Sequence, residues 1–177
     1  ALPICRTVSS TEPNLADLPV VTEGGHNINV EAVLDDAALG ADARPAIVEV
    51  GAGTGYYLSH TLDTVENSRG VGLDVSTAAA KRLASAHPRV GAVVADAWSQ
   101  LPLRDSSTDA IMVVFAPRNA AEFARVLSPK GEVVVLTADA GHLAELREPL
   151  GIIDVEKGKV ERMIAQASGH LEPVAPS

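Results

Sequence analysis

The chain has 177 residues, of which 46% are hydrophobic but only 3% aromatic, and its formal net charge is −9. This length is typical of one domain, whose core must consist mostly of Ala, Val, Leu and Ile. The acidic balance argues against a nucleic-acid binder, since such proteins usually present a basic face to phosphates. The single cysteine excludes a disulfide framework and a multi-cysteine zinc site within this chain.

Membrane and metal functions find no support in the sequence. There is no apolar run long enough to cross a bilayer and no signal-peptide pattern, so we expect no membrane association and a cytoplasmic location. No cluster of His, Cys, Asp and Glu has metal-ligand spacing. No Ser/His/Asp or Cys/His arrangement indicates nucleophilic catalysis either, so the catalytic residues stay unknown.

The N-terminal segment differs in composition from the rest of the chain. Residues 1–25 are rich in Pro, Gly, Ser and Thr, which is typical of an irregular lead-in or linker. The sequence therefore predicts a boundary near residue 25 and one domain over 26–177. A short helix is expected over 30–39, with Asn29 as its N-cap.

From Ala46 onward, apolar strands alternate with helices, a pattern typical of a doubly wound, mostly parallel α/β sheet. The predicted strands cover 46–50, 70–74, 91–95, 110–115 and 132–137, and the predicted helices cover 56–62, 77–86 and 120–127. Ser76 is the expected N-cap of the second of these helices, and Pro129-Lys130-Gly131 is expected to end the third. One more helix is predicted over 155–167, followed by a loose end over 172–177, which leaves room for a sheet that is incomplete at the C-terminus.

The most informative segment is the first strand with the glycines that follow it, Gly51, Gly53 and Gly55. Alternating glycines before a helix let a ligand lie against bare backbone N–H groups. A dinucleotide fingerprint would need Gly where Tyr56 stands, and a kinase-type phosphate loop would need Gly-Lys-Ser/Thr. The spacing therefore favours a cofactor without phosphates, such as S-adenosylmethionine. The alternative is a strand-to-helix turn that tolerates glycine.

Acidic residues end the next two predicted strands, at the edge where such sheets bind ligands. Asp74 lies 19 residues after Gly55, a suitable distance for a carboxylate that binds the two ribose hydroxyls; its alternative role is to cap the next helix. Asp96 could accept a hydrogen bond from an adenine amino group, with the N–H of Ala97 serving a ring nitrogen. A turn-forming aspartate is the alternative there.

Three other polar residues have weaker support. Arg118 follows Phe115-Ala116-Pro117 and could attract a phosphate or only be solvated. His142, just past the fifth predicted strand, and His26 are more typical of caps or surface groups than of ligands.

Several segments of this chain occur together in one known family. They are Glu49–Tyr57, Gly72–Ser76, Leu101-Pro102-Leu103, Phe115–Arg118, Glu122–Leu127 and His142–Leu146. On these segments the chain resembles the bacterial 23S rRNA (guanine-N1)-methyltransferases, which include macrolide-resistance enzymes. The resemblance covers roughly residues 25–163 and implies a class I methyltransferase fold, S-adenosylmethionine as cofactor and a guanine in a 23S rRNA hairpin as substrate.

The resemblance also implies cofactor contacts at Gly53, Thr54 and His142. Together with the residue-based predictions, the expected cofactor-binding set is Gly51, Gly53, Thr54, Gly55, Asp74, Val75, Asp96, Ala97 and His142. The family carries an N-terminal zinc module where this chain has only Cys5, and it continues past the region of Ala165. We therefore expect a reduced relative or an incomplete chain.

Two other functions remain open from the sequence. A small-molecule methyltransferase of the same fold is favoured by the acidic charge. A remnant that binds the cofactor without activity is the third reading, motivated by the terminal segments that the family has and this chain does not show.

Overall fold

The computed structural model describes residues 4–9, 44–137 and 159–174. Their elements are β1 (Ile4–Ser9), β2 (Ala46–Val50), α2 (Tyr56–Thr64), β3 (Arg69–Asp74), α3 (Thr77–Leu83), β4 (Val90–Val94), β5 (Thr108–Val114), α4 (Ala120–Val126), β6 (Leu127–Thr137), α6 (Lys159–Ala167) and β7 (Glu172–Val174). Within the described ranges, no helix is long and apolar enough to span a membrane.

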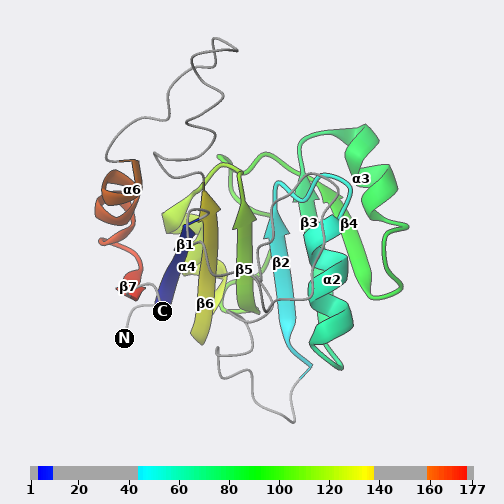
Figure 1. The fold of residues 1–177 in the computed structure, drawn as a ribbon, viewed down its shortest axis with the longest axis horizontal. Coiled ribbons are helices and arrows are strands. Elements are labelled where there is room, and N and C mark those ends of the chain that lie inside the picture. Colours follow the sequence, from blue (N-terminus) through cyan, green and yellow to red (C-terminus); the bar gives the residue numbers. More distant parts are fainter. Residues whose placement is uncertain (1–3, 10–43, 138–158, 175–177) are drawn as a thin grey trace.

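The strands form one seven-stranded sheet in the order β4-β3-β2-β5-β6-β1-β7, and every pair in it is parallel (Figure 1). The chain adds β3 and β4 on one side of β2, and then β5 and β6 on the other side. The prediction of a doubly wound parallel sheet is therefore confirmed. The reversal between β2 and β5 is the point at which such sheets bind ligands, at the carboxyl ends of their strands.

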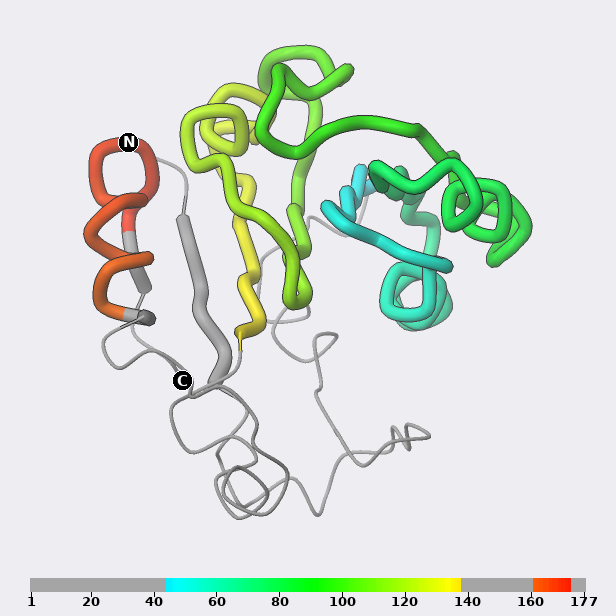
Figure 2. Tube along the Cα trace, turned by 90° about the horizontal axis from the view of Figure 1, so that it is seen from above, coloured from blue at the N-terminus to red at the C-terminus, as the bar shows by residue number. Residues whose placement is uncertain are grey.

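Side chains of the central strands alternate between two aliphatic cores. Val48 and Val50 pack into the same core as Phe123 of α4, which also contains Met163 of α6. Ile47 instead packs into the core of α2 and α3 on the other face of the sheet. Figure 2 shows α2 and α4 on opposite sides of the sheet. The strands are buried on both faces, as their continuous apolar sequences predict.

Two segments that the sequence predicts as irregular belong to the sheet. Residues 4–9 form β1, which pairs with β6 from Ile4 opposite Glu132 to Ser9 opposite Thr137. Residues 172–174 form β7, which pairs with β1. The prediction of an irregular lead-in is wrong for 4–9, and that of a loose end is wrong for 172–174. Both strands find their partners far away in the sequence, which local patterns do not reveal.

Several predicted boundaries also change. The helix predicted over 77–86 ends at Leu83. Leu127, predicted as helical, is the first residue of β6, so Pro129-Lys130-Gly131 lies within a strand. The last described helix begins at Lys159, and the earlier part of the helix predicted over 155–167 lies outside the described residues, as does the helix predicted over 30–39.

Side chains hydrogen-bond to the backbone of the loops at the amino edge of the sheet and hold these loops in place. The Arg89 guanidinium donates to the carbonyl oxygens of Leu62, of Val65 at 3.2 Å and of Ser68 at 2.9 Å, next to the C-terminal end of α2. The backbone N–H of Ala46 donates to Oδ2 of Asp109 at 2.9 Å, which fixes the start of β2 against β5. These side chains form their hydrogen bonds within the chain, and their role is to stabilise the fold.

Arg125 holds the loop between β4 and β5 in the same way. Its guanidinium donates to the carbonyl oxygens of Leu101 at 3.0 Å and Leu103 at 2.9 Å and forms ion pairs of 2.6 Å with Asp105 and Glu122. The loop between β4 and β5 is thereby attached to α4.

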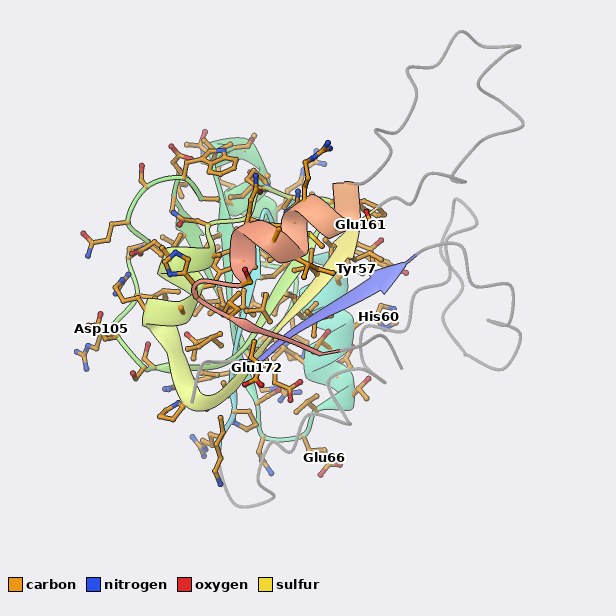
Figure 3. All side chains as sticks on the ribbon, turned by 90° about the vertical axis from the view of Figure 1, so that its left-hand side faces the viewer. Tyr57, His60, Glu66, Asp105, Glu161 and Glu172 are labelled. Carbon is orange, nitrogen blue, oxygen red and sulfur yellow. The ribbon has the colours of Figure 1, made fainter. Side chains whose placement is uncertain are left out.

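Negative charge is spread over the surface of the described residues. The exposed acids Glu66, Asp105 and Glu161 lie on separate parts of the molecule in Figure 3. These three acids therefore do not form one acidic face.

Candidate functional site

A cavity of about 380 Å³ opens where the carboxyl ends of β2, β3, β4 and β5 meet. It is lined by Val50, Gly51, Leu73, Asp74, Val75, Ala95, Asp96, Ala97, Trp98, Phe115, Ala116 and Pro117. Five of the residues predicted for cofactor binding thus come together here, from three successive strand ends. The size and the mostly apolar lining with a few polar groups are typical of a small-molecule site.

The three glycines after β2 have different roles, although all three have positive φ angles of 71°, 55° and 86°. A Cβ on Gly51 would lie 2.5 Å from the Cβ of Ala116, and one on Gly55 would lie 2.5 Å from Cδ1 of Leu83. A Cβ on Gly53 would meet nothing within 4 Å. Packing therefore requires Gly51 and Gly55, whereas Gly53 leaves open space that a ligand can use.

The backbone N–H groups of this loop are largely engaged within the chain. Gly51 and Ala52 both donate to the carbonyl oxygen of Leu73, at 2.8 and 3.0 Å. Gly53 donates to Oδ2 of Asp74 at 2.8 Å. The prediction of bare N–H groups is therefore wrong for Gly51 and Gly53, because the loop turns these donors toward β3. What the loop offers a ligand is close approach at Gly53.

Asp74 connects the glycine loop to the helix after β3. Its Oδ1 accepts from the N–H of Ser76 at 2.8 Å, in addition to the bond from Gly53. Ser76 itself is the N-cap of α3, as predicted, since its side chain accepts from the N–H of Ala79. Each carboxylate oxygen of Asp74 has a further lone pair, so the residue can serve both the loop and a ligand in the cavity.

Asp96 closes a turn after β4. Its Oδ1 accepts from the N–H of Trp98 at 3.0 Å, and its Oδ2 accepts from the hydroxyl of Ser99 at 3.4 Å. Asp96 therefore has the turn-forming role that the sequence left open as an alternative. Asp96 and Ala97 also line the cavity, and their contact with an adenine stays a prediction.

Two exposed aromatic rings line the cavity, although the chain has only five aromatic residues. Trp98 is 68% exposed and Phe115 is 49% exposed, and both line the cavity. Phe115 has a φ of 51°, which is rare and costly for a bulky residue and is found mainly at functional positions. Trp98 is not among the residues predicted from the sequence; the signal that marks it is a large ring within an otherwise small and polar segment.

A buried acid, which the sequence analysis did not predict as a site residue, lies beneath the loop. Glu49 is 1% exposed, and its Oε2 accepts from the N–H of Leu58 in α2 at 3.1 Å. Burial raises the pKa of Glu49 to about 8, against the lowering effect of the bond from Leu58, and the nearby carboxylate of Asp74 adds to the rise. The carboxyl group therefore holds a proton at neutral pH.

The remaining predicted residues lie beside the cavity or outside the description. Thr54 is exposed in the loop, and Gly55 is buried against α3. His142 and His26 lie outside the described residues. In the part of the chain that the structure describes, no group of three or more His, Cys, Asp or Glu side chains could hold a metal ion.

Comparisons with known proteins agree with this geometry. Residues 47–131 match a family model described as a methyltransferase domain. The chain is 43% identical over 137 residues to the 23S rRNA (guanine(748)-N1)-methyltransferase of Streptomyces fradiae, covering 77% of this chain and 49% of that protein. It is 46% identical over 131 residues to a protein of Micromonospora griseorubida that is named a putative 23S rRNA (guanine-N1)-methyltransferase, covering 74% of this chain and 44% of that protein. The chain thus spans about half the length of these curated relatives.

Solved structures share the fold. The geranyl diphosphate C-methyltransferase of Streptomyces coelicolor superposes with a TM-score of 0.56 at 15% identity, covering 77% of this chain and 57% of that chain. A Haloferax volcanii protein solved with the Trm112 methyltransferase activator gives 0.54 at 22% identity, covering 77% and 67%. At these identities the likeness concerns the fold alone.

Proposed function

We propose that this chain, which belongs to the class I S-adenosylmethionine-dependent methyltransferases, transfers a methyl group to N1 of a guanine in a 23S rRNA hairpin. The observation that carries the proposal is the sequence identity with two relatives named for this reaction, over a region that includes the whole cavity. Because the chain spans about half of each relative, the substrate is inferred from them rather than from a visible RNA surface. With rRNA as its substrate, the protein would act in the cytoplasm, and we propose that location.

The polar groups in and beside the cavity support an adenosyl cofactor. Gly53 leaves space beside the loop for the amino-acid part of the cofactor, and Asp74 retains lone pairs for two ribose hydroxyls. Asp96 and Ala97 lie at the next strand end, where an adenine would follow the ribose. The proposed cofactor-binding residues are Gly51, Gly53, Thr54, Gly55, Asp74, Val75, Asp96, Ala97 and His142.

Bound S-adenosylmethionine supplies a methyl group activated by the positive charge on sulfur. The contribution of the chain is to hold that group in line with the acceptor nitrogen, since orientation can provide much of the rate of such a transfer. The segment that carries Phe115 stands at the mouth of the cavity, where an acceptor base would approach. A guanine within a stem must be turned out of its stack to reach this point.

The proposal is tested by incubating protein from the complete reading frame with radiolabelled S-adenosylmethionine and an unmodified 23S rRNA hairpin. We expect label in the RNA, and digestion to nucleosides should release it as 1-methylguanosine. A hairpin in which inosine replaces the target guanine tests recognition of the 2-amino group, and one with adenine there is the control that should stay unlabelled. Label on a different nucleoside, or none on RNA, contradicts the proposal.

A small-molecule methyltransferase is the second candidate, and one observation favours it. Among the described residues, the lining of the cavity contains two acids, Asp74 and Asp96, and no Lys or Arg. A polyanionic substrate would find no positively charged side chain in this described part of the lining. Transfer of label from the cofactor to compounds of a metabolite extract, with none to rRNA, would favour this second function.

A further inference from the structure

A second cavity, of about 350 Å³, lies between α4, α6 and β6. Its walls are apolar side chains of these elements, together with Trp98, Arg118 and Gln166. Trp98 lines both cavities, so the two are neighbours. The segment after β5 connects them, since Phe115, Ala116 and Pro117 line the first and Arg118 lines the second.

Arg118 is the unusual group in this cavity. It is half-buried, and no hydrogen bond or ion pair engages it among the described residues. Arg89 and Arg125, in contrast, each donate to several oxygen atoms of the chain. A guanidinium that lies against apolar walls without an anion is unfavourable on its own, and it matches the geometry of a phosphate.

Trp98 provides an aromatic surface beside this cation. Its backbone is held from two sides, because its N–H donates to Asp96 and its carbonyl oxygen accepts from Nδ2 of Asn119 at 3.4 Å. The side chain nevertheless stays 68% exposed. An exposed ring on a fixed backbone, next to an unpaired arginine, is the combination that binds unpaired nucleotides by stacking and phosphate contact.

We propose that the second cavity binds one unpaired nucleotide of the RNA substrate, with its base stacked on Trp98 and its phosphate paired with Arg118. This nucleotide is a neighbour of the target guanine, because the target must itself reach the first cavity, where the methyl group lies. The inference rests on the proposed function and adds the anchor that holds the RNA beside the cofactor. Arg118 also supplies a positive charge, which the described lining of the first cavity lacks.

The test measures RNA methylation and ligand binding with W98A, W98F, R118A and R118K in protein from the complete reading frame. We expect W98A and R118A each to raise KM for the hairpin about tenfold, the usual scale for one stacked base or one charged contact, with little change in kcat. W98F and R118K should be affected less. R82A, which removes an exposed arginine from α3 on the other face of the sheet, is the matched control and should keep the wild-type KM.

Fluorescence of Trp98 gives a second readout that a structural role would not produce. Stacking of a base on the ring should quench the emission that W98F lacks, on addition of either the hairpin or guanosine monophosphate. R118A should weaken the quenching by both ligands. Equal quenching in wild type and R118A overturns the phosphate contact.

The remaining outcomes separate this proposal from the proposed function. If wild type methylates no rRNA but guanosine monophosphate still quenches Trp98 in an Arg118-dependent way, the nucleotide site stands and the rRNA function fails. If rRNA is methylated with unchanged KM in W98A and R118A, the function stands and the nucleotide site is overturned. If W98A instead loses affinity for S-adenosylhomocysteine alone, Trp98 belongs to the cofactor cavity and the proposal is wrong.

Discussion

Arg89 at the amino edge of the sheet and Arg118 at its carboxyl edge have opposite surroundings. At the amino edge, Arg89 and Asp109 are bonded to backbone groups that start or end the elements. At the carboxyl edge, Arg118 has no described partner, and Trp98 and Phe115 are exposed. The difference separates residues that the fold needs from residues that are left for ligands. Four pairs of substitutions test where that division lies.

The largest effect on stability is expected at Gly55, which is needed for packing although it lies at the carboxyl edge of the sheet, beside the cavity. G55A places a methyl group 2.5 Å from Leu83 in a residue with a φ of 86°, so it should cost about 3 kcal/mol or more of the free energy of unfolding. G53A, with open space around it, should cost about 1–2 kcal/mol from backbone strain and mainly reduce cofactor affinity. Denaturant unfolding and calorimetry with S-adenosylhomocysteine measure the two effects. Equal loss of stability in both variants would contradict the division between the glycines.

Arg89 should behave as a purely structural residue. R89A removes the donors to three carbonyl groups near the end of α2, and we expect a loss of roughly 2–3 kcal/mol in the free energy of unfolding. R118A, with no bonds to lose, should change stability by less than about 0.5 kcal/mol. Chemical denaturation of both variants gives the comparison, and a strongly destabilised R118A would place that residue with the fold.

Asp74 has both a structural and a ligand-binding role. It accepts a hydrogen bond from the glycine loop and, in our proposal, binds the ribose. D74A should weaken binding of S-adenosylhomocysteine by about 2 kcal/mol, since it removes an acceptor for ligand hydroxyls and releases the N–H of Gly53. D74N keeps one acceptor oxygen and should lose less. Isothermal titration calorimetry measures both variants, and unchanged affinity in D74A removes Asp74 from the site.

Glu49 makes stability depend on pH. The unfolded chain releases this proton near pH 4.5, whereas burial keeps it on the folded chain up to a pKa of about 8. The free energy of unfolding should therefore fall as pH rises between these values, by up to about 1.4 kcal/mol per pH unit. E49Q should remove this slope while keeping an acceptor for the N–H of Leu58.

The control for Glu49 is E122Q. Arg125 lowers the pKa of the Glu122 carboxyl group, so its stabilising effect is lost only as pH falls. E122Q should therefore keep the slope of the wild type between pH 4.5 and 8. Thermal unfolding across this range measures all three proteins, and a slope that persists in E49Q assigns it to another group.

Local signals carried the prediction of the site. Gly51 and Asp74 stand directly after continuous apolar strands, so their meeting at one edge follows from the parallel sheet alone. The N-cap at Ser76 is equally local, because it depends on the residues just after it. The roles of the three glycines were not predictable in this way, since Leu83 and Ala116 come from other elements.

The sequence by itself determined the order of strands and helices between residues 46 and 137, the glycine loop with its two acids, and the family resemblance, because each depends on periodicity or on residues close together in the chain. Only the tertiary structure decided that residues 4–9 and 172–174 join the sheet, that Glu49 is buried enough to hold a proton, and that Trp98 lies between two cavities. Strand pairing, burial and cavities all arise from contacts between distant segments, which no local pattern encodes.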